Sequence, residues 1–107
     1  MALGLALALA AAACGADVDD VCATSDLTYE TFGGPFVTTW CRGCHSRDQP
    51  MRQRAPVDIN FDTRADVERF AQDIQRVAGT GRTMPPAGGP SDAERALLVE
   101  WVSCDTP

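Results

Sequence analysis

The run CRGCH at positions 41–45 holds the residues of this sequence best suited to cofactor or metal chemistry. Its two cysteines stand three positions apart, so on a helix their thiols lie about one turn from each other. An imidazole follows at once, and because the chain has a single histidine, any histidine chemistry must use His45. The spacing C-x-x-C-H is typical of covalent haem attachment, in which each thiol forms a thioether and the histidine ligates the iron.

Three other interpretations of this run remain open. A thioredoxin-like redox pair is expected after a strand in a βαβ unit, and no such pattern precedes Cys41. A zinc site could use Cys41, Cys44 and His45, but neighbouring ligands fit a tetrahedral ion poorly and no fourth ligand is evident. A plain disulfide between Cys41 and Cys44 is the third. We predict one covalent haem c at Cys41 and Cys44, with His45 as an axial iron ligand.

The first thirteen residues are apolar and have the length of the hydrophobic region of a signal peptide. Because a membrane-spanning helix needs about 20 such residues, we predict that 1–13 is a signal peptide and that the chain is exported. Small residues precede Cys14, as in a bacterial lipobox, so we expect lipidation of Cys14 and a membrane anchor in the periplasm or at the outer surface. The alternative is ordinary cleavage near Ala13, which leaves Cys14 unmodified. Residues 14–27 are predicted to form an acidic tether.

The charge of the chain limits its partners. Nine arginines, no lysines and fifteen acidic residues give a net charge of −6. This balance argues against nucleic-acid binding, which normally uses a basic face. It favours protein partners that present basic docking surfaces. A domain this small also needs a staple or a cofactor to be stable.

Three helical stretches are predicted, and no segment alternates with the period of a strand. The first is short, around 35–41, and is opened by two glycines with Pro35 in its first turn. The second covers 64–78, with Thr63 and Asp66 resembling a capping box and Gly79 placed as the residue that ends it.

The third stretch starts at the capping box Ser91 and Glu94, and its apolar face consists of Leu97, Leu98, Trp101 and Val102. Two loops, 46–60 and 79–90, separate the helices. The fold class is therefore all-α, with long loops that need something to pack against.

Three segments carry a resemblance to a known family. They are PFVTTWCRGCHS at 35–46, QRVAGTGR at 75–82 and TMPPAGGPSDAERALLVEWVSC at 83–104. Together they resemble a small single-haem class I cytochrome c of the exported bacterial type. The resemblance implies a class I cytochrome c fold over 28–107, with about three helices and long loops around one haem.

The family also implies a second axial ligand. Met84 lies in a proline-containing loop and fits that position, whereas Met51 is only six residues from His45. With both axial positions filled, the resemblance implies an electron carrier and no enzyme activity. One alternative is a ligand-binding or sensing module in which Met84 is displaced. A peroxidase-like haem enzyme is the other, although no second histidine is present as a distal base.

The resemblance implies further contacts. The carbonyl of Pro56 is expected to accept a hydrogen bond from His45, and Phe36 or Val37 is expected to pack against Trp101. Leu97 and Leu98 are expected to face the haem edge. Arginines on the loops could partner the haem propionates, although a solvated side chain is the default for each: Arg52, Arg54 and Arg82.

A disulfide between Cys22 and Cys104 is implied in the same way, since relatives often carry a terminal pair and export permits it. If Cys14 is not acylated, it becomes a third candidate for this pairing.

Overall fold

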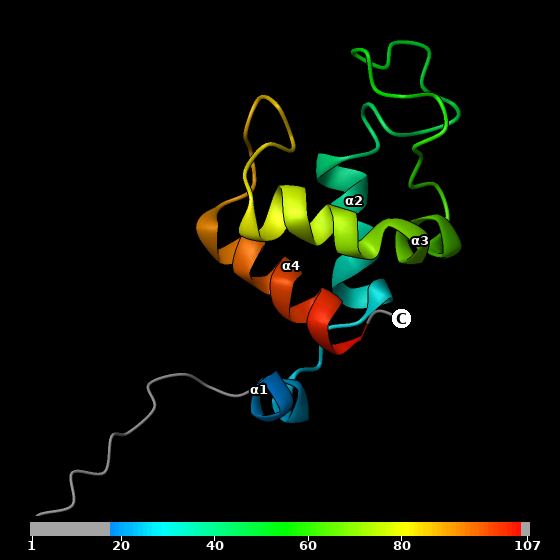
Figure 1. The fold of residues 1–107 in the computed structure, drawn as a ribbon. Coiled ribbons are helices and arrows are strands. Elements are labelled where there is room, and N and C mark those ends of the chain that lie inside the picture. Colours follow the sequence, from blue (N-terminus) through cyan, green and yellow to red (C-terminus); the bar gives the residue numbers. More distant parts are fainter. Residues whose placement is uncertain (1–17, 106–107) are drawn as a thin grey trace, which may run out of the picture.

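The computed structural model describes residues 18–105, and all the regular elements in this range are helices, with no strand among them. The predicted all-α class is confirmed for this part of the chain. Figure 1 shows α3, α4 and the α2 segment packed together, with two long loops leaving the same side of this helical body. The elements in chain order are α1 Val18–Thr24, η1 Tyr29–Gly33, α2 Gly34–Trp40, α3 Arg64–Ile74, η2 Gln75–Thr80 and α4 Asp92–Cys104, where η1 and η2 are π-helical.

The first helix, predicted around 35–41, begins earlier, at Tyr29. Thr28 and Thr31 cap it reciprocally: the Thr31 N–H donates to Thr28 Oγ1 at 3.1 Å, and the Thr28 N–H donates to Thr31 Oγ1 at 2.9 Å. The chain then passes through η1 into α2 because Gly33 and Gly34 both have right-handed helical backbone angles. The glycines therefore continue the helix, and the cap is a Thr-x-x-Thr pair instead of the usual Ser-x-x-Glu.

The second and third helices start where they were predicted. Thr63 with Asp66 and Ser91 with Glu94 each form a complete capping box. The predicted role of Gly79 is wrong, because the chain stays helical through Thr80. Gly79 instead allows close packing: a Cβ there would lie 2.9 Å from Val99 Cγ2.

The helix of η1 and α2 crosses α4 at Gly33. A Cβ on Gly33 would lie 2.3 Å from the Trp101 ring, so this contact requires glycine. The aromatic partners of Trp101 are Tyr29 and Phe32, with ring centroids 6.5 and 6.2 Å away. Phe36 and Val37, one of which was expected to pack against Trp101, lie with it in the same buried core. The buried core consists of Phe36, Val37, Phe61, Val67, Ala71, Ile74, Ala78, Leu98, Trp101 and Val102.

The segment 14–27, predicted to be an acidic tether, contains the short helix α1. Val18–Thr24 form a helix that contacts α4, and Cys22 and Cys104 lie with their sulfur atoms 1.99 Å apart and their Cα atoms 5.1 Å apart. The structure thus brings together the pair expected to form the disulfide. The predicted signal peptide and Cys14 lie outside the described residues.

Candidate functional site

The CRGCH run forms the turn that follows α2. The N–H of Cys41 donates to the carbonyl of Val37 at 2.9 Å, so the helical pattern continues into the run. The N–H groups of Cys44 and His45 both donate to the carbonyl of Cys41, at 3.1 and 2.9 Å. Both cysteines are free thiols. One turn therefore presents two thiols and an imidazole from positions 41, 44 and 45.

The environment of Cys41 bears on the thioredoxin-like alternative. Burial raises the pKa of the Cys41 thiol to about 12. Redox-active cysteines act as thiolates and occupy surroundings that lower their pKa. Cys41 is thus a protonated thiol at neutral pH, unlike the nucleophilic cysteine of such a pair.

His45 is held on two sides. Its Nδ1 lies 3.0 Å from the carbonyl oxygen of Ile59, and its backbone carbonyl accepts the N–H of Phe61 at 2.9 Å. The ring also packs against Phe61, with centroids 5.1 Å apart. Because a carbonyl can only accept, Nδ1 carries the proton and the lone pair of the neutral ring is on Nε2. This is the nitrogen that a metal would use.

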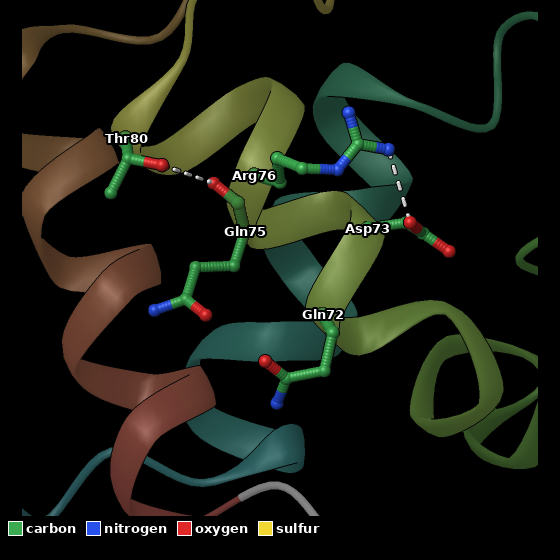
Figure 2. A pocket seen from close by; sticks show the side chains of 5 residues that line it. All are labelled: Gln72, Asp73, Gln75, Arg76 and Thr80. Atoms are coloured by element: carbon green, nitrogen blue, oxygen red, sulfur yellow. Dashed lines mark hydrogen bonds and ion pairs between the residues drawn. The ribbon is translucent and has the colours of Figure 1, made fainter.

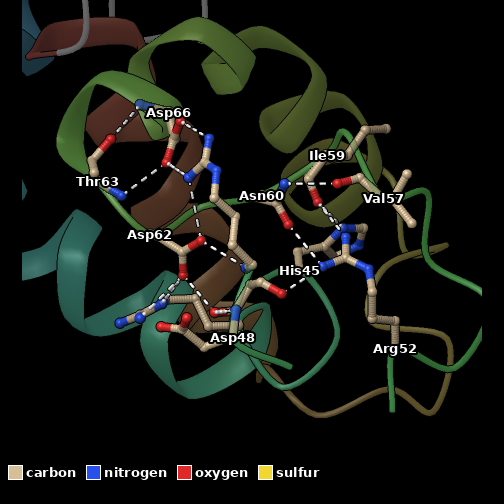
Figure 3. A network of polar contacts seen from close by, with 12 residues as sticks. His45, Asp48, Arg52, Val57, Ile59, Asn60, Asp62, Thr63 and Asp66 are labelled. Carbon is tan, nitrogen blue, oxygen red and sulfur yellow. Dashed lines mark hydrogen bonds and ion pairs between the residues drawn. The ribbon is translucent and has the colours of Figure 1, made fainter. Parts of the chain in front are cut away.

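The expected partner of His45 is therefore wrong. The carbonyl of Pro56 accepts from Arg52 Nη2 at 2.6 Å. The carbonyl of Ile59, and not that of Pro56, is the acceptor for His45 Nδ1. The shift arises because Arg52 folds the loop 46–60 around its guanidinium, as Figure 3 shows. Arg52 donates to loop carbonyls and to Asn60, so the structure does not place it as a free propionate partner.

An acidic pair joins this turn to the start of α3. Asp62, labelled in Figure 3, accepts from the backbone N–H of Arg47 at 2.8 Å and from Ser46 Oγ at 2.5 Å. The side chains of Arg42 and Arg47 also donate to it. These hydrogen bonds, the backbone one first, hold the pKa of the Asp62 carboxyl below its usual range. Asp62 therefore fixes the backbone directly after His45 to the helix start.

Asp66 completes this network. It accepts from both terminal nitrogens of Arg47, at 2.7 and 2.9 Å, and from the backbone N–H of Thr63 at 3.0 Å. The Arg47 hydrogen bonds are the main reason that the pKa of the Asp66 carboxyl lies well below its usual range. The capping role of Asp66 was predictable from the sequence, whereas its pairing with Arg47 was not, because residues nineteen positions apart show no local pattern.

Met84 is fixed through its backbone. Its N–H donates to the carbonyl of Val77 at 3.0 Å, and its carbonyl accepts from Arg95 Nη1 at 3.0 Å. Its side chain is 38% exposed. The other methionine considered, Met51, is 71% exposed on the loop 46–60. The structure thus offers a thioether on a clamped backbone at Met84.

Arg95 is a site residue that the sequence analysis missed. It is 5% exposed, and its Nη1 also donates to the carbonyl of Ala78 at 2.7 Å. One signal was available, since Arg95, Leu98 and Val102 follow each other at steps of three and four on α4 and so share its buried face. A charged residue on such a face needs a buried partner.

The loop that carries Met84 lies against the end of α2. A Cβ on Gly89 would fall 2.4 Å from the ring of Trp40, the residue directly before Cys41. Gly89 has a φ of +135°, which an L side chain rarely adopts. In Figure 1 this loop and the loop that follows His45 rise from the same side of the helices. Met84 follows His45 by 39 positions in the sequence. Its loop and the CRGCH turn nevertheless belong to one region of the molecule.

The remaining predicted positions are less closely tied to this region. Arg82 pairs with Asp92, and Arg54 is exposed with a φ of +68°. Leu98 is fully buried, whereas Leu97 is 39% exposed.

Two hollows on the described surface differ in position. One of about 390 Å³ opens on the outer face of α3 and η2, where polar side chains line it, as Figure 2 shows. The other, of about 200 Å³, lies beside α2 and includes Phe36, Trp40 and Glu94 in its lining. Only the second adjoins the helix that ends in the CRGCH turn.

The residues present fit a covalently attached haem. Free thiols at Cys41 and Cys44, an Nε2 lone pair on His45 and a partly exposed thioether at Met84 are the donor set that such a group requires. Over 18–105, the His, Cys, Asp and Glu side chains do not gather in groups of three that could hold a metal ion by themselves.

Comparison with protein-family models, with curated proteins and with solved structures finds no match for this chain. None of the helices in the described part is long and apolar enough to cross a membrane.

Proposed function

We propose that this protein transfers single electrons through one haem c, bound covalently at Cys41 and Cys44 and ligated by His45 and Met84. In this proposal the fold of 28–107 is that of a class I cytochrome c. The observation that carries it is the turn after α2, where two free thiols precede an imidazole whose Nδ1 is already engaged by Ile59. An engaged Nδ1 is the usual arrangement of a ligating histidine, since it fixes the tautomer and the ring orientation.

Each residue has a distinct role. The thiols of Cys41 and Cys44 form the thioether links, and His45 offers Nε2 to the iron. When bound, the haem supplies a one-electron couple at its iron and a large apolar surface for the loops to cover. Met84 offers its sulfur as the second ligand, and the clamp by Val77 and Arg95 limits its movement away from that position.

The clamp on Met84 favours electron transfer over the other two functions. A sensing module requires the methionine to leave, and a peroxidase requires an open coordination position. The two hydrogen bonds of the Met84 backbone, one of them from the buried Arg95, oppose the loop movement that either function requires. We therefore place displacement of Met84 second among the candidate functions.

The test is expression with a periplasmic cytochrome maturation system, followed by haem staining of a denaturing gel and spectroscopy. We expect covalent haem in the wild type and a weak far-red band from methionine ligation in the ferric protein. Met84→Ala should abolish this band and let the ferrous protein bind carbon monoxide. Met51→Ala is the matched control on the other loop, and it should change neither the far-red band nor the binding of carbon monoxide.

Two outcomes would contradict the proposal. Absence of covalent haem in the wild type would remove its basis, and so would unchanged haem binding in the double variant Cys41→Ser, Cys44→Ser. A high-spin wild-type spectrum with free carbon monoxide binding would favour the sensing function instead.

We also propose that the chain works in the cell envelope, anchored by lipid at Cys14, with partners that present basic surfaces to its net charge of −6. Palmitate labelling of the wild type and its loss in Cys14→Ser test the anchor. Labelling that persists in Cys14→Ser would disprove it.

A further inference from the structure

The loop 46–60 is organised by one side chain. The Arg52 guanidinium uses all three of its nitrogens, and none of its partners is a carboxylate. The acceptors are the carbonyl oxygens of Ser46 at 2.5 Å, Ala55 at 3.4 Å, Pro56 at 2.6 Å and Ile59 at 3.1 Å, together with Asn60 Oδ1 at 2.8 Å.

Asn60 extends this arrangement. It is 3% exposed, and its side-chain amide donates to the carbonyl of Val57 at 2.9 Å while its Oδ1 accepts from Arg52. The backbone on both sides of Ile59 is thus tied to the same guanidinium, directly or through Asn60. The orientation of the Ile59 carbonyl depends on these ties.

The carbonyl oxygen of Ile59 is shared by two donors. His45 Nδ1 lies 3.0 Å from it, and Arg52 Nη2 lies 3.1 Å from it (Figure 3). A carbonyl oxygen has two lone pairs, so it can accept both hydrogen bonds. The arginine therefore holds the acceptor on which the tautomer of His45 depends.

We propose that Arg52 is the positioning residue for His45. It fixes the Ile59 carbonyl, which holds the Nδ1 proton and leaves Nε2 free as the ligating atom. This inference rests on the proposed function only in so far as Nε2 binds iron. Arg52 also sets a positive charge one carbonyl away from the ligand, and this charge opposes the extra positive charge of the oxidised centre.

The experiment uses the haem-loaded protein with Arg52→Met, Arg52→Lys and, as the matched control from the same loop, Arg54→Met. The first readout is the solvent exchange rate of the His45 Nδ1 proton, followed by NMR in the ferrous protein. The second is the midpoint reduction potential.

We expect Arg52→Met to speed this exchange by about tenfold or more, since the loop opens more often without its central donor. Its potential should move to more negative values because the positive charge is lost. Arg52→Lys keeps the charge, so its potential should stay nearer to the wild type, while its exchange rate rises because an ammonium cannot reach five acceptors. Arg54→Met should leave the exchange rate unchanged.

Equal exchange rates in wild type and Arg52→Met would overturn the proposal, as would equal changes in Arg52→Met and Arg54→Met. If Arg52→Met does not fold, Arg52→Lys decides alone, and an exchange rate equal to that of the wild type would overturn it. If the wild type carries no haem, the proposed function fails separately. The role of Arg52 is then read from the ¹⁵N shifts of His45, which should show the Nδ1–H tautomer in the wild type and a mixture in Arg52→Lys.

Discussion

Single residues of the candidate site are held by charged partners that approach from other segments. Arg47 reaches Asp66, Arg52 reaches the acceptor of His45, and Arg95 reaches Met84. In each case a guanidinium fixes a short piece of backbone beside a candidate ligand or a helix start. Arginine suits this role because its donors form a rigid fork.

Asp66 should make the stability of the protein depend on pH. Its folded pKa lies below the unfolded value, so its contribution is fully present above about pH 4 and is lost as the pH falls further. We expect Asp66→Asn to reduce the free energy of unfolding at pH 7 by about 1–3 kcal/mol, and this difference should shrink below about pH 4. Urea unfolding of both proteins at pH 7 and at pH 3 measures this difference.

The control is Asp73→Asn on the same helix, where the carboxylate pairs with Arg76 at an exposed position. Its effect should stay within about 0.5 kcal/mol. A loss for Asp66→Asn that is the same at pH 3 and pH 7 would contradict the assignment.

Arg95 should matter for both stability and ligation. In Arg95→Met the carbonyls of Ala78 and Met84 lose their donor, and we expect the free energy of unfolding to fall by about 1–3 kcal/mol. The far-red band should weaken as the Met84 loop loosens. Urea unfolding and absorbance of the ferric protein measure the two effects.

Arg76→Met is the matched arginine control, because that side chain lies on the surface and pairs with the exposed Asp73. Equal losses in Arg95→Met and Arg76→Met would show that Arg95 has no special role in holding Met84.

The residues of the CRGCH motif could be identified from the sequence, but the residues that hold them in position could not. Cys41, Cys44 and His45 follow from spacing alone. The acceptor of His45 is Ile59 and not Pro56, because its place depends on how the loop folds around Arg52. No local pattern encodes that packing.

Among the elements, the ends of helices show what a sequence can and cannot specify. The capping boxes at Thr63 and Ser91 use local hydrogen bonds, so their residues predicted the starts of α3 and α4. The start at Thr28 was missed because threonine replaces the usual acidic residue at the third position. Gly33, Gly34 and Gly79 resemble helix breakers, yet Gly33 and Gly79 serve helix crossings that only the packed structure reveals.

The crossing at Gly33 should not tolerate a side chain. Gly33 has an ordinary helical backbone with φ of −61°, so alanine would by itself favour the helix by about 1 kcal/mol. Because the added methyl would overlap the Trp101 ring, we expect Gly33→Ala instead to lower the free energy of unfolding by about 1–3 kcal/mol. Chemical unfolding followed by tryptophan fluorescence measures it.

Gly43→Ala is the control, since nothing lies within 4 Å of a Cβ at that position. A stability of Gly33→Ala at or above that of Gly43→Ala would mean that α4 moves freely away from the crossing.

At the scale of the whole molecule, the two ends of the described chain lie together. α1 contacts α4, and Cys22 and Cys104 are separated by 82 positions in sequence. The sequence suggested the pairing only through a family resemblance, and it gave no sign of the helix, since α1 has no buried residue to produce an apolar stripe.

Loss of this cross-link should destabilise the protein strongly. On the chain-entropy model, a closed loop of this length stabilises the fold by about 4–5 kcal/mol. We expect the double variant Cys22→Ser, Cys104→Ser to lose most of this free energy of unfolding, as measured in guanidinium chloride.

Wild-type protein treated with a reductant should match the double variant, and the double variant itself should not respond to the reductant. A loss below about 1 kcal/mol would show that the contacts of α1 with α4 suffice without the bond.

The position of α1 also decides which way the molecule would face on a membrane. Val18 follows Cys14 by four positions, and four extended residues reach at most about 14 Å. In a chain acylated at Cys14, the end of the body bearing α1 would thus rest close to the lipid headgroups. The long loop between α2 and α3 and the loop between η2 and α4 extend from the opposite end (Figure 1), so they would point outward, open to a partner arriving from the aqueous side.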